Sequence, residues 1–135
     1  MLLTKECDYA LRIIRALADG TKKNVETIAE EQYIPLTYAY NIIKKLGRAN
    51  FVQSIRGRSG GYCLHKPLGS FSLADVIDTI DSNRFVSGCL HEDFACSFRN
   101  HPDRQCTVHR HLARIQSNIS SEMKSLTMDV ALYVV

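Results

Sequence analysis

The chain has 135 residues and a net charge of +3, a length that suits one domain, or one compact domain with an interaction arm, and excludes two full catalytic domains. Hydrophobic residues make up 45% and charged residues 23%, which excludes an intrinsically disordered or collagen-like chain. No apolar run approaches the roughly 18 residues of a membrane span, and the N-terminal stretch contains acids and no small-residue cleavage site. We therefore expect a cytoplasmic protein with no membrane partner.

The positive charge is concentrated in one part of the chain. Residues 1–70 contain 11 basic and 6 acidic residues, whereas residues 71–135 contain 6 basic and 8 acidic residues. Within residues 36–66 there are six lysines and arginines and no acid. Such a block favours binding to a polyanion such as DNA, although a basic face exposed only to solvent would have the same composition.

The first fifty residues predict three helices in succession. A first helix would follow a capping Thr4 and end before Gly20, and a second would follow a capping Asn24 and stop before Pro35. A third helix is predicted over residues 36 to about 49 because its apolar residues recur with helical spacing. A short helix, a tight turn and a helix with an acid-free polar face form the helix-turn-helix pattern, in which the second helix enters the major groove of DNA.

The polar face of the third helix carries hydroxyl, amide and cationic groups, with Thr37, Asn41 and Lys44 at helical spacing. Tyr38 lies at the edge of this face, where it could equally be a core contact. We expect the following side chains to face the major groove or its phosphates: Thr37, Tyr38, Tyr40, Asn41, Lys44 and Lys45.

Residues 51–64 predict a β-hairpin whose turn is rich in glycine. Arg56 and Arg58 stand among these glycines at the tip. Glycine lets a backbone come close to a groove wall, and arginine is favoured in the narrow, negative minor groove. Directly after a helix-turn-helix, this pattern predicts a wing in which Arg56 and Arg58 enter or flank the minor groove.

The second half of the chain combines two helices with an aperiodic stretch between them. A capping-box pattern at Ser72 predicts a short helix to about residue 80, and residues 82–105 show no clear period. A narrow apolar stripe follows, with a period near 3.5, which favours pairing with a partner helix. A helix packed on its own domain would also explain the stripe. Its members are Val108, Leu112, Ile115, Ile119 and Leu126.

The chain has five cysteines, an odd number, and we see no export signal in its sequence. We therefore do not expect these cysteines to form a framework of structural disulfides. Cys89, Cys96, Cys106 and His109 form the pattern C-x6-C-x9-C-x2-H. Thiolates bind soft or borderline metals, and four ligands complete either a tetrahedral zinc site or an iron–sulfur cluster. The wide spacing, without paired C-x2-4-C knuckles, favours a cluster over zinc, and unligated thiols remain an alternative.

These features predict a mainly α fold with a small β-hairpin wing, in which a winged helix-turn-helix domain is followed by a long C-terminal dimerisation helix. We expect residues 1–80 to form the DNA-binding domain and residues 81–106 a cysteine-rich, cluster-binding loop. Residues 107–135 would form the dimerisation helix and a C-terminal segment.

The chain resembles the IscR-type winged-helix transcription regulators, a family of iron–sulfur cluster, nitric oxide and cysteine-metabolism regulators. The resemblance runs from Leu3 to about Leu132 and includes the three clustered cysteines. Its most specific motifs are Asp8-Tyr9-Ala10-Leu11-Arg12, Ile28-Ala29-Glu30, Ile34-Pro35 and the wing string Ser54-Ile55-Arg56-Gly57-Arg58-Ser59-Gly60-Gly61-Tyr62.

The resemblance implies a homodimer built on the C-terminal helix, with palindrome-like sites in double-stranded DNA and one cluster per subunit, [2Fe–2S] in preference to [4Fe–4S]. By the same resemblance, Cys89, Cys96 and Cys106 are the cluster thiolates and His109 is the fourth ligand. Some members instead use an acidic residue near the N-terminus of the partner subunit, which is the place of Asp8 here.

We therefore expect a DNA-binding transcriptional regulator, a repressor or an activator, that senses iron, redox or nitric oxide status through its cluster. The alternative is a metal-free thiol switch in which one of the clustered cysteines is oxidised. We expect no enzyme and no small-molecule substrate, because the sequence has no C-x-x-C motif, nucleotide-binding glycine pattern or Ser-His-Asp order.

Overall fold

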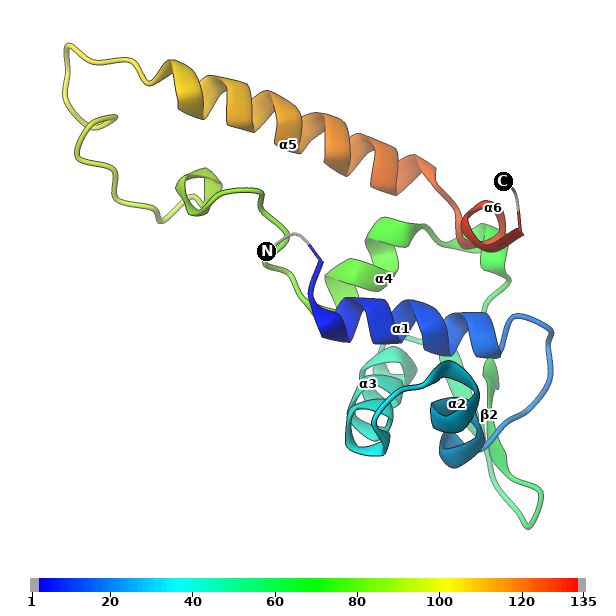
Figure 1. Ribbon diagram of the computed structural model, residues 1–135. Coiled ribbons are helices and arrows are strands. Elements are labelled where there is room, and N and C mark those ends of the chain that lie inside the picture. Colours follow the sequence, from blue (N-terminus) through cyan, green and yellow to red (C-terminus); the bar gives the residue numbers. More distant parts are fainter. Residues whose placement is uncertain (1–2, 134–135) are drawn as a thin grey trace.

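The computed structural model describes residues 3–133, and these form a mainly helical fold with one β-hairpin (Figure 1). The predicted fold class is therefore confirmed. The elements in chain order are α1 (Lys5–Ala16), α2 (Val25–Gln32), α3 (Leu36–Arg48), β1 (Val52–Ile55), β2 (Gly61–Leu64), the 3-10 turn η1 (Leu68–Ser70), α4 (Leu73–Ile80), the 3-10 turn η2 (Gly88–Leu90), α5 (Thr107–Ser125) and α6 (Met128–Tyr133).

Helices α1, α2 and α3 pack around a shared apolar core, and the predicted caps begin the first two. The Thr4 hydroxyl accepts the Cys7 N–H, and the Asn24 side chain accepts the Thr27 N–H. Between α2 and α3 the chain turns at Tyr33, which has a left-handed backbone with φ 55°. The core of the three helices is made by Ile13, Ile14, Leu17, Ile28, Ile42, Ile43 and Leu46, all fully buried.

The hairpin is attached to the helices by a strand contact that lies outside the predicted hairpin. Lys23, just before α2, exchanges two backbone hydrogen bonds with Tyr62 of β2, at 3.0 and 2.7 Å. A side chain at the neighbouring Gly61 would place its Cβ 2.6 Å from the Lys23 carbonyl oxygen, so glycine is required where the two backbones meet. The base of the wing is thereby held beside α2.

The C-terminal segment returns to the winged domain and is fastened to it through the backbone. The Leu73 N–H donates to the Leu126 carbonyl at 2.8 Å, and the Met128 N–H donates to the Phe71 carbonyl at 3.0 Å. Met128 is buried in the core, and residues 126–127 break the C-terminal helical stretch into α5 and α6. The extended backbone at this break supplies the strand-like contact beside α4.

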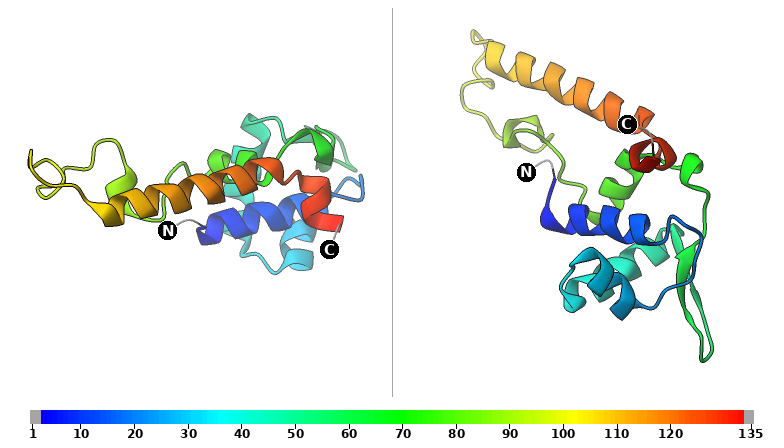
Figure 2. Two further views of the ribbon diagram at one scale, coloured as in Figure 1. Left: turned by 90° about the horizontal axis from the view of Figure 1, so that it is seen from above. Right: turned by 45° about the vertical axis from the view of Figure 1, so that its right-hand side comes forward.

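Helix α5 lies on the side of α1 and α4 opposite to α2 and α3, and its N-terminal end extends away from the winged domain (Figures 1 and 2). Its apolar stripe is accordingly divided. Ile119 is partly buried against the core, whereas Val108 and Ile115 are 63% and 44% exposed. Packing on the chain's own domain therefore explains only the C-terminal part of the stripe. Of the helices in residues 3–133, none is both long and apolar enough to cross a membrane.

Residues 82–105, which showed no hydrophobic period in the sequence, lie in an extended loop. Within residues 81–106, the only regular structure is the 3-10 turn η2. It leads from α4 to the far end of α5 (Figure 1). The Gln116 side chain of α5 accepts the Val86 N–H at 2.8 Å and donates to the Arg84 carbonyl at 3.3 Å. These contacts hold the first part of the loop against α5.

Candidate DNA interface and cysteine loop

The polar face of α3 is open to solvent along most of its length. Thr37, Tyr40, Asn41 and Lys44 are exposed. Tyr38 is 43% exposed and also packs edge-on against Tyr9, with ring centroids 5.6 Å apart. Tyr38 therefore makes a core contact, and part of its side chain is still exposed to solvent.

Lys45 differs from the other lysine of this face because it already has an anionic partner. Its ammonium lies 2.8 Å from the Glu6 carboxylate of α1, and both side chains are partly exposed. In residues 3–133, the cations of the acid-free block that take part in no ion pair include Lys44, Arg56 and Arg58. The structure thus leaves cations available on both α3 and the wing.

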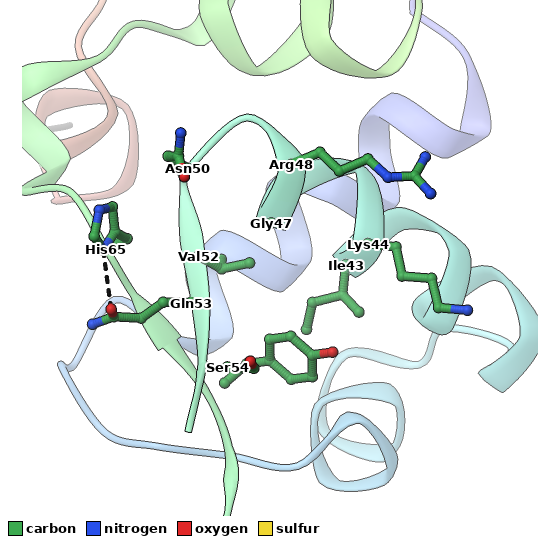
Figure 3. A pocket seen from close by; sticks show the side chains of 10 residues that line it. Ile43, Lys44, Gly47, Arg48, Asn50, Val52, Gln53, Ser54 and His65 are labelled. Atoms are coloured by element: carbon green, nitrogen blue, oxygen red, sulfur yellow. Dashed lines mark hydrogen bonds between the residues drawn. The ribbon is translucent and has the colours of Figure 1, made fainter. Parts of the chain in front are cut away.

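An open groove runs between the C-terminal half of α3 and the hairpin (Figure 3). Lys44 and Arg48 extend from α3 on one side. On the other side, the side-chain amide oxygen Oε1 of Gln53 lies 3.0 Å from Nδ1 of His65. Gln53 and His65 are diagonal neighbours on the exposed face of the hairpin. Sequence reasoning missed this pair, although strand alternation could have placed Gln53 on the outer face.

The wing tip carries its two arginines on an exposed turn. Gly57 has φ 119°, a conformation that favours glycine, and Arg56 and Arg58 on either side of it are exposed. A Cβ at Gly60 would lie 2.5 Å from the Ile55 carbonyl oxygen, so the chain needs glycine to close the turn. The glycines therefore shape the turn that presents both guanidinium groups.

Tyr40 is held by a residue that sequence reasoning did not select. Its hydroxyl donates a hydrogen bond to the carboxylate of Glu26 in α2. This bond lowers the pKa of Glu26 below its ordinary value and, together with partial burial, raises the pKa of Tyr40. Since the only hydroxyl proton of Tyr40 is committed to Glu26, its oxygen can act toward a ligand only as an acceptor.

Each of the three clustered cysteines receives a hydrogen bond at its sulfur. Cys89 Sγ accepts the Ser87 hydroxyl at 3.3 Å, and Cys96 Sγ accepts the Arg99 N–H at 3.5 Å. Cys106 caps α5, and its sulfur accepts the His109 N–H at 3.3 Å. All three are half-buried free thiols, whereas Cys7 is buried in α1.

Arg99 connects the parts of the loop that carry these residues. Its Nη1 lies 3.2 Å from Nδ1 and 3.0 Å from Nε2 of His109, and it donates to the Cys89 carbonyl at 3.4 Å. Among residues 3–133, however, no three histidine, cysteine or acidic side chains converge closely enough to hold a metal ion. Asp8 lies in α1, where its carboxylate pairs with Arg12 at 2.8 Å.

Comparison with known sequences identifies a family for nearly the whole chain. The Rrf2 family, described as an iron-dependent transcriptional regulator, matches residues 3–132. A protein of Haemophilus influenzae named as an HTH-type transcriptional regulator is 33% identical over 93 residues, which are 67% of this chain and 62% of that protein. An rrf2-like HTH-type regulator of Rhodobacter capsulatus is 30% identical over 115 residues, 73% of this chain and 77% of its own.

Solved structures share the fold at low sequence identity. IscR of T. potens has a TM-score of 0.72 and 21% identity, with 98% of this chain and 86% of that chain covered. The oxidised form of CymR from Staphylococcus aureus has a TM-score of 0.77 and 19% identity, with 100% and 98% covered.

The hydrogen bond between Glu26 and Tyr40 can be tested by removing the hydroxyl. In Tyr40→Phe, we expect the pKa of Glu26 to rise toward its ordinary value, because the donor that stabilises its carboxylate is gone. A carboxyl whose pKa is lowered by folding stabilises the fold at pH values above its unfolded-state pKa, and this stabilisation is lost as the pH falls through its folded-state pKa. In Tyr40→Phe, the contribution of Glu26 to this loss of stability at low pH should therefore be smaller. Titration of the Glu26 carboxyl carbon by NMR measures the shift, with Tyr38→Phe as the control, and an unchanged pKa would show that the bond is absent.

Proposed function

The chain belongs to the Rrf2 family of transcriptional regulators, and we propose that it is a homodimeric DNA-binding regulator that senses iron, redox or nitric oxide status through an iron–sulfur cluster. In this proposal residues 1–80 bind DNA, residues 81–106 hold the cluster and residues 107–135 form the dimer contact. The observation that carries the sensing part is that three thiols of one loop each accept a hydrogen bond.

The DNA-binding part rests on the exposed, acid-free face of α3 and its continuation to the wing. Thr37, Asn41 and Lys44 would face base edges or phosphates of the major groove, and Tyr40 would accept a hydrogen bond from a base edge. Tyr38 would lie at the edge of the contact. Lys45 would contribute a phosphate contact beside its pairing with Glu6. From the exposed tip of the wing, Arg56 and Arg58 would reach the minor groove of the DNA.

The cysteine loop suits an iron–sulfur cluster in its chemistry. Cys89, Cys96 and Cys106 would be the thiolate ligands, with His109 as the fourth ligand and Asp8 of the partner subunit as its alternative. Hydrogen-bond donors at the sulfurs, such as those present here, are what tune an iron–sulfur site. When bound, the cluster supplies a redox-active and oxidant-sensitive inorganic centre, [2Fe–2S] in preference to [4Fe–4S].

Helix α5 connects the cysteine loop to the DNA-binding domain. At its N-terminal end it carries His109, and Gln116 fixes the preceding part of the loop through the Arg84 carbonyl. At its C-terminal end, the backbone contacts of Leu126 and Met128 fasten it beside α4. A change of loop conformation would therefore act on the winged domain through α5, provided that the DNA-competent and DNA-incompetent states differ in the loop.

A metal-free thiol switch is the second candidate function. CymR of Staphylococcus aureus has the same fold, and the structure compared above is its oxidised form. The CymR structure from B. subtilis, which also has this fold, is named as that of a global cysteine regulator. In this chain Cys89, Cys96 and Cys106 are half-buried free thiols that an oxidant can reach. A disulfide between two of them would constrain the same loop that the cluster would otherwise order.

The absorption spectrum of anaerobically purified protein tests the cluster. We expect visible absorption that Cys96→Ala abolishes, because a thiolate ligand is lost, and that the control Cys63→Ala retains. His109→Ala should leave a weaker, shifted chromophore. If Asp8→Ala alters the spectrum and His109→Ala does not, the carboxylate of the partner subunit is the ligand. A colourless wild-type protein that loses free thiols with peroxide would favour the thiol switch.

The wing can be tested by its contribution to DNA affinity. Replacing Arg56 and Arg58 with alanine should weaken specific binding by roughly 1–3 kcal/mol for each groove contact, because both guanidinium groups lie outside the core. Fluorescence anisotropy over a salt series gives the change for each single substitution, and Arg104→Ala, which removes one charge from the cysteine loop, is the charge-matched control. A similar loss on every DNA sequence would indicate phosphate contacts only, and unchanged affinity would contradict the wing assignment.

The exposed part of the α5 stripe is the proposed dimer contact. Ile115→Asp should dissociate the dimer, since an unpaired charge in an apolar contact costs several kcal/mol. Ser117→Asp, an exposed residue two positions further along the same helix, is the control and should leave the assembly intact. Sedimentation velocity distinguishes the two states, and an intact Ile115→Asp dimer would place the contact elsewhere.

A further inference from the structure

The hydrogen bond between Tyr40 and Glu26 joins the polar face of α3 to the first turn of α2. Tyr40 lies between Thr37 and Lys44 at helical spacing, so it shares the exposed polar face with them, and it is 39% exposed. Its hydroxyl donates to the Glu26 carboxylate. Glu26 is the second residue of α2, so the packing of α2 beside α3 brings this carboxylate to a side chain of the polar face.

The direction of this hydrogen bond is fixed at neutral pH. Glu26 lies in the first turn of α2, where the positive end of the helix dipole stabilises a carboxylate. The bond from Tyr40 lowers the pKa of Glu26 and raises the pKa of Tyr40. An ionised carboxylate has no proton to donate and a neutral phenol has one, so the shared proton belongs to Tyr40. The Tyr40 oxygen is therefore left with acceptor capacity only.

An acceptor-only hydroxyl distinguishes two classes of base in the major groove. Adenine and cytosine present an exocyclic amino group there, whereas guanine and thymine present a carbonyl oxygen. A free tyrosine hydroxyl can accept from the amino group or donate to the carbonyl, so it accommodates both classes. With its proton on Glu26, Tyr40 can bond only the amino group, and a carbonyl oxygen opposite it would leave two acceptors facing each other.

We propose that Glu26 is a specificity-determining positioning residue, which makes Tyr40 select adenine or cytosine over guanine or thymine at the base position that Tyr40 faces. The inference rests on the DNA-binding function proposed above and names the class of base that one side chain of α3 reads. Glu26 acts through the hydroxyl proton of Tyr40 and needs no DNA contact of its own.

Helix α2 also contains a matched carboxylate. Glu30 lies one turn after Glu26, is exposed and takes part in no ion pair within residues 3–133. Replacing either glutamate by glutamine removes one negative charge, which should strengthen binding to every DNA sequence. An amide can donate as well as accept, so only Glu26→Gln also removes the fixed direction of the Tyr40 bond.

The test is the base preference of the full 135-residue chain, purified anaerobically. Affinity selection from a double-stranded DNA library of randomised sequence, followed by sequencing, measures it. We expect the wild type to prefer adenine or cytosine at one position about 5- to 10-fold, the scale of one hydrogen bond made instead of lost. Tyr40→Phe and Glu26→Gln should reduce this preference to below about 2-fold at that position and leave the other positions unchanged. Glu30→Gln should retain it.

Retention of the preference in Glu26→Gln, with helical content intact by circular dichroism, would overturn the role of Glu26. Loss of the preference in Glu30→Gln as well would overturn it too, because the effect would then be one of charge. A guanine or thymine preference that depends on Tyr40 would show that the hydroxyl donates to DNA, against the inference. A selected site with no position that depends on Tyr40 would overturn the inference alone, whereas a wild type that selects no sequence would overturn the proposed DNA-binding function with it.

Discussion

The backbone contact between the start of α4 and the break after α5 determines how the rest of the molecule is arranged. Two hydrogen bonds, from Leu73 to Leu126 and from Met128 to Phe71, fasten the C-terminal segment to the winged domain. Phe71 and Met128, the two residues of the second bond, are both buried in the core. Because α5 is attached at this end, its other end extends outward with the cysteine loop. Val108 and Ile115 of its apolar stripe therefore stay exposed.

The local elements were predictable because their signals lie within a few residues of one another. Thr4, Asn24 and Ser72 each cap a helix as their sequence context predicts. The burial of Ile42 and Leu46 beside an exposed Asn41 follows from helical period alone. The wing followed from a glycine-rich turn between two short apolar segments. These features were sufficient to predict the winged helix-turn-helix fold.

The remaining features depend on residues that are far apart in the sequence and have no local signal. The strand contact of Lys23 with Tyr62 spans 39 residues, and it is made through backbone groups that every residue possesses. The partners of Tyr40 and His109 are likewise chosen by tertiary packing. A carboxylate at Glu26 or a guanidinium at Arg99 is an ordinary surface residue until the fold brings it to its partner. The candidate ligands could be named from spacing, whereas their hydrogen-bond donors could not.

The geometry of α5 suits the proposed transmission of a signal over a long distance. Nineteen residues in a helix span about 28 Å, so α5 joins the cysteine loop to the winged domain over that distance. It is fastened beside α4 at its C-terminal end by backbone hydrogen bonds. A displacement at the His109 end must therefore tilt α5 against α4 or change its contact with a partner helix. In the proposed homodimer, either movement alters the spacing of the two α3 helices, and this spacing has to match DNA half-sites about one helical turn, or a multiple of it, apart.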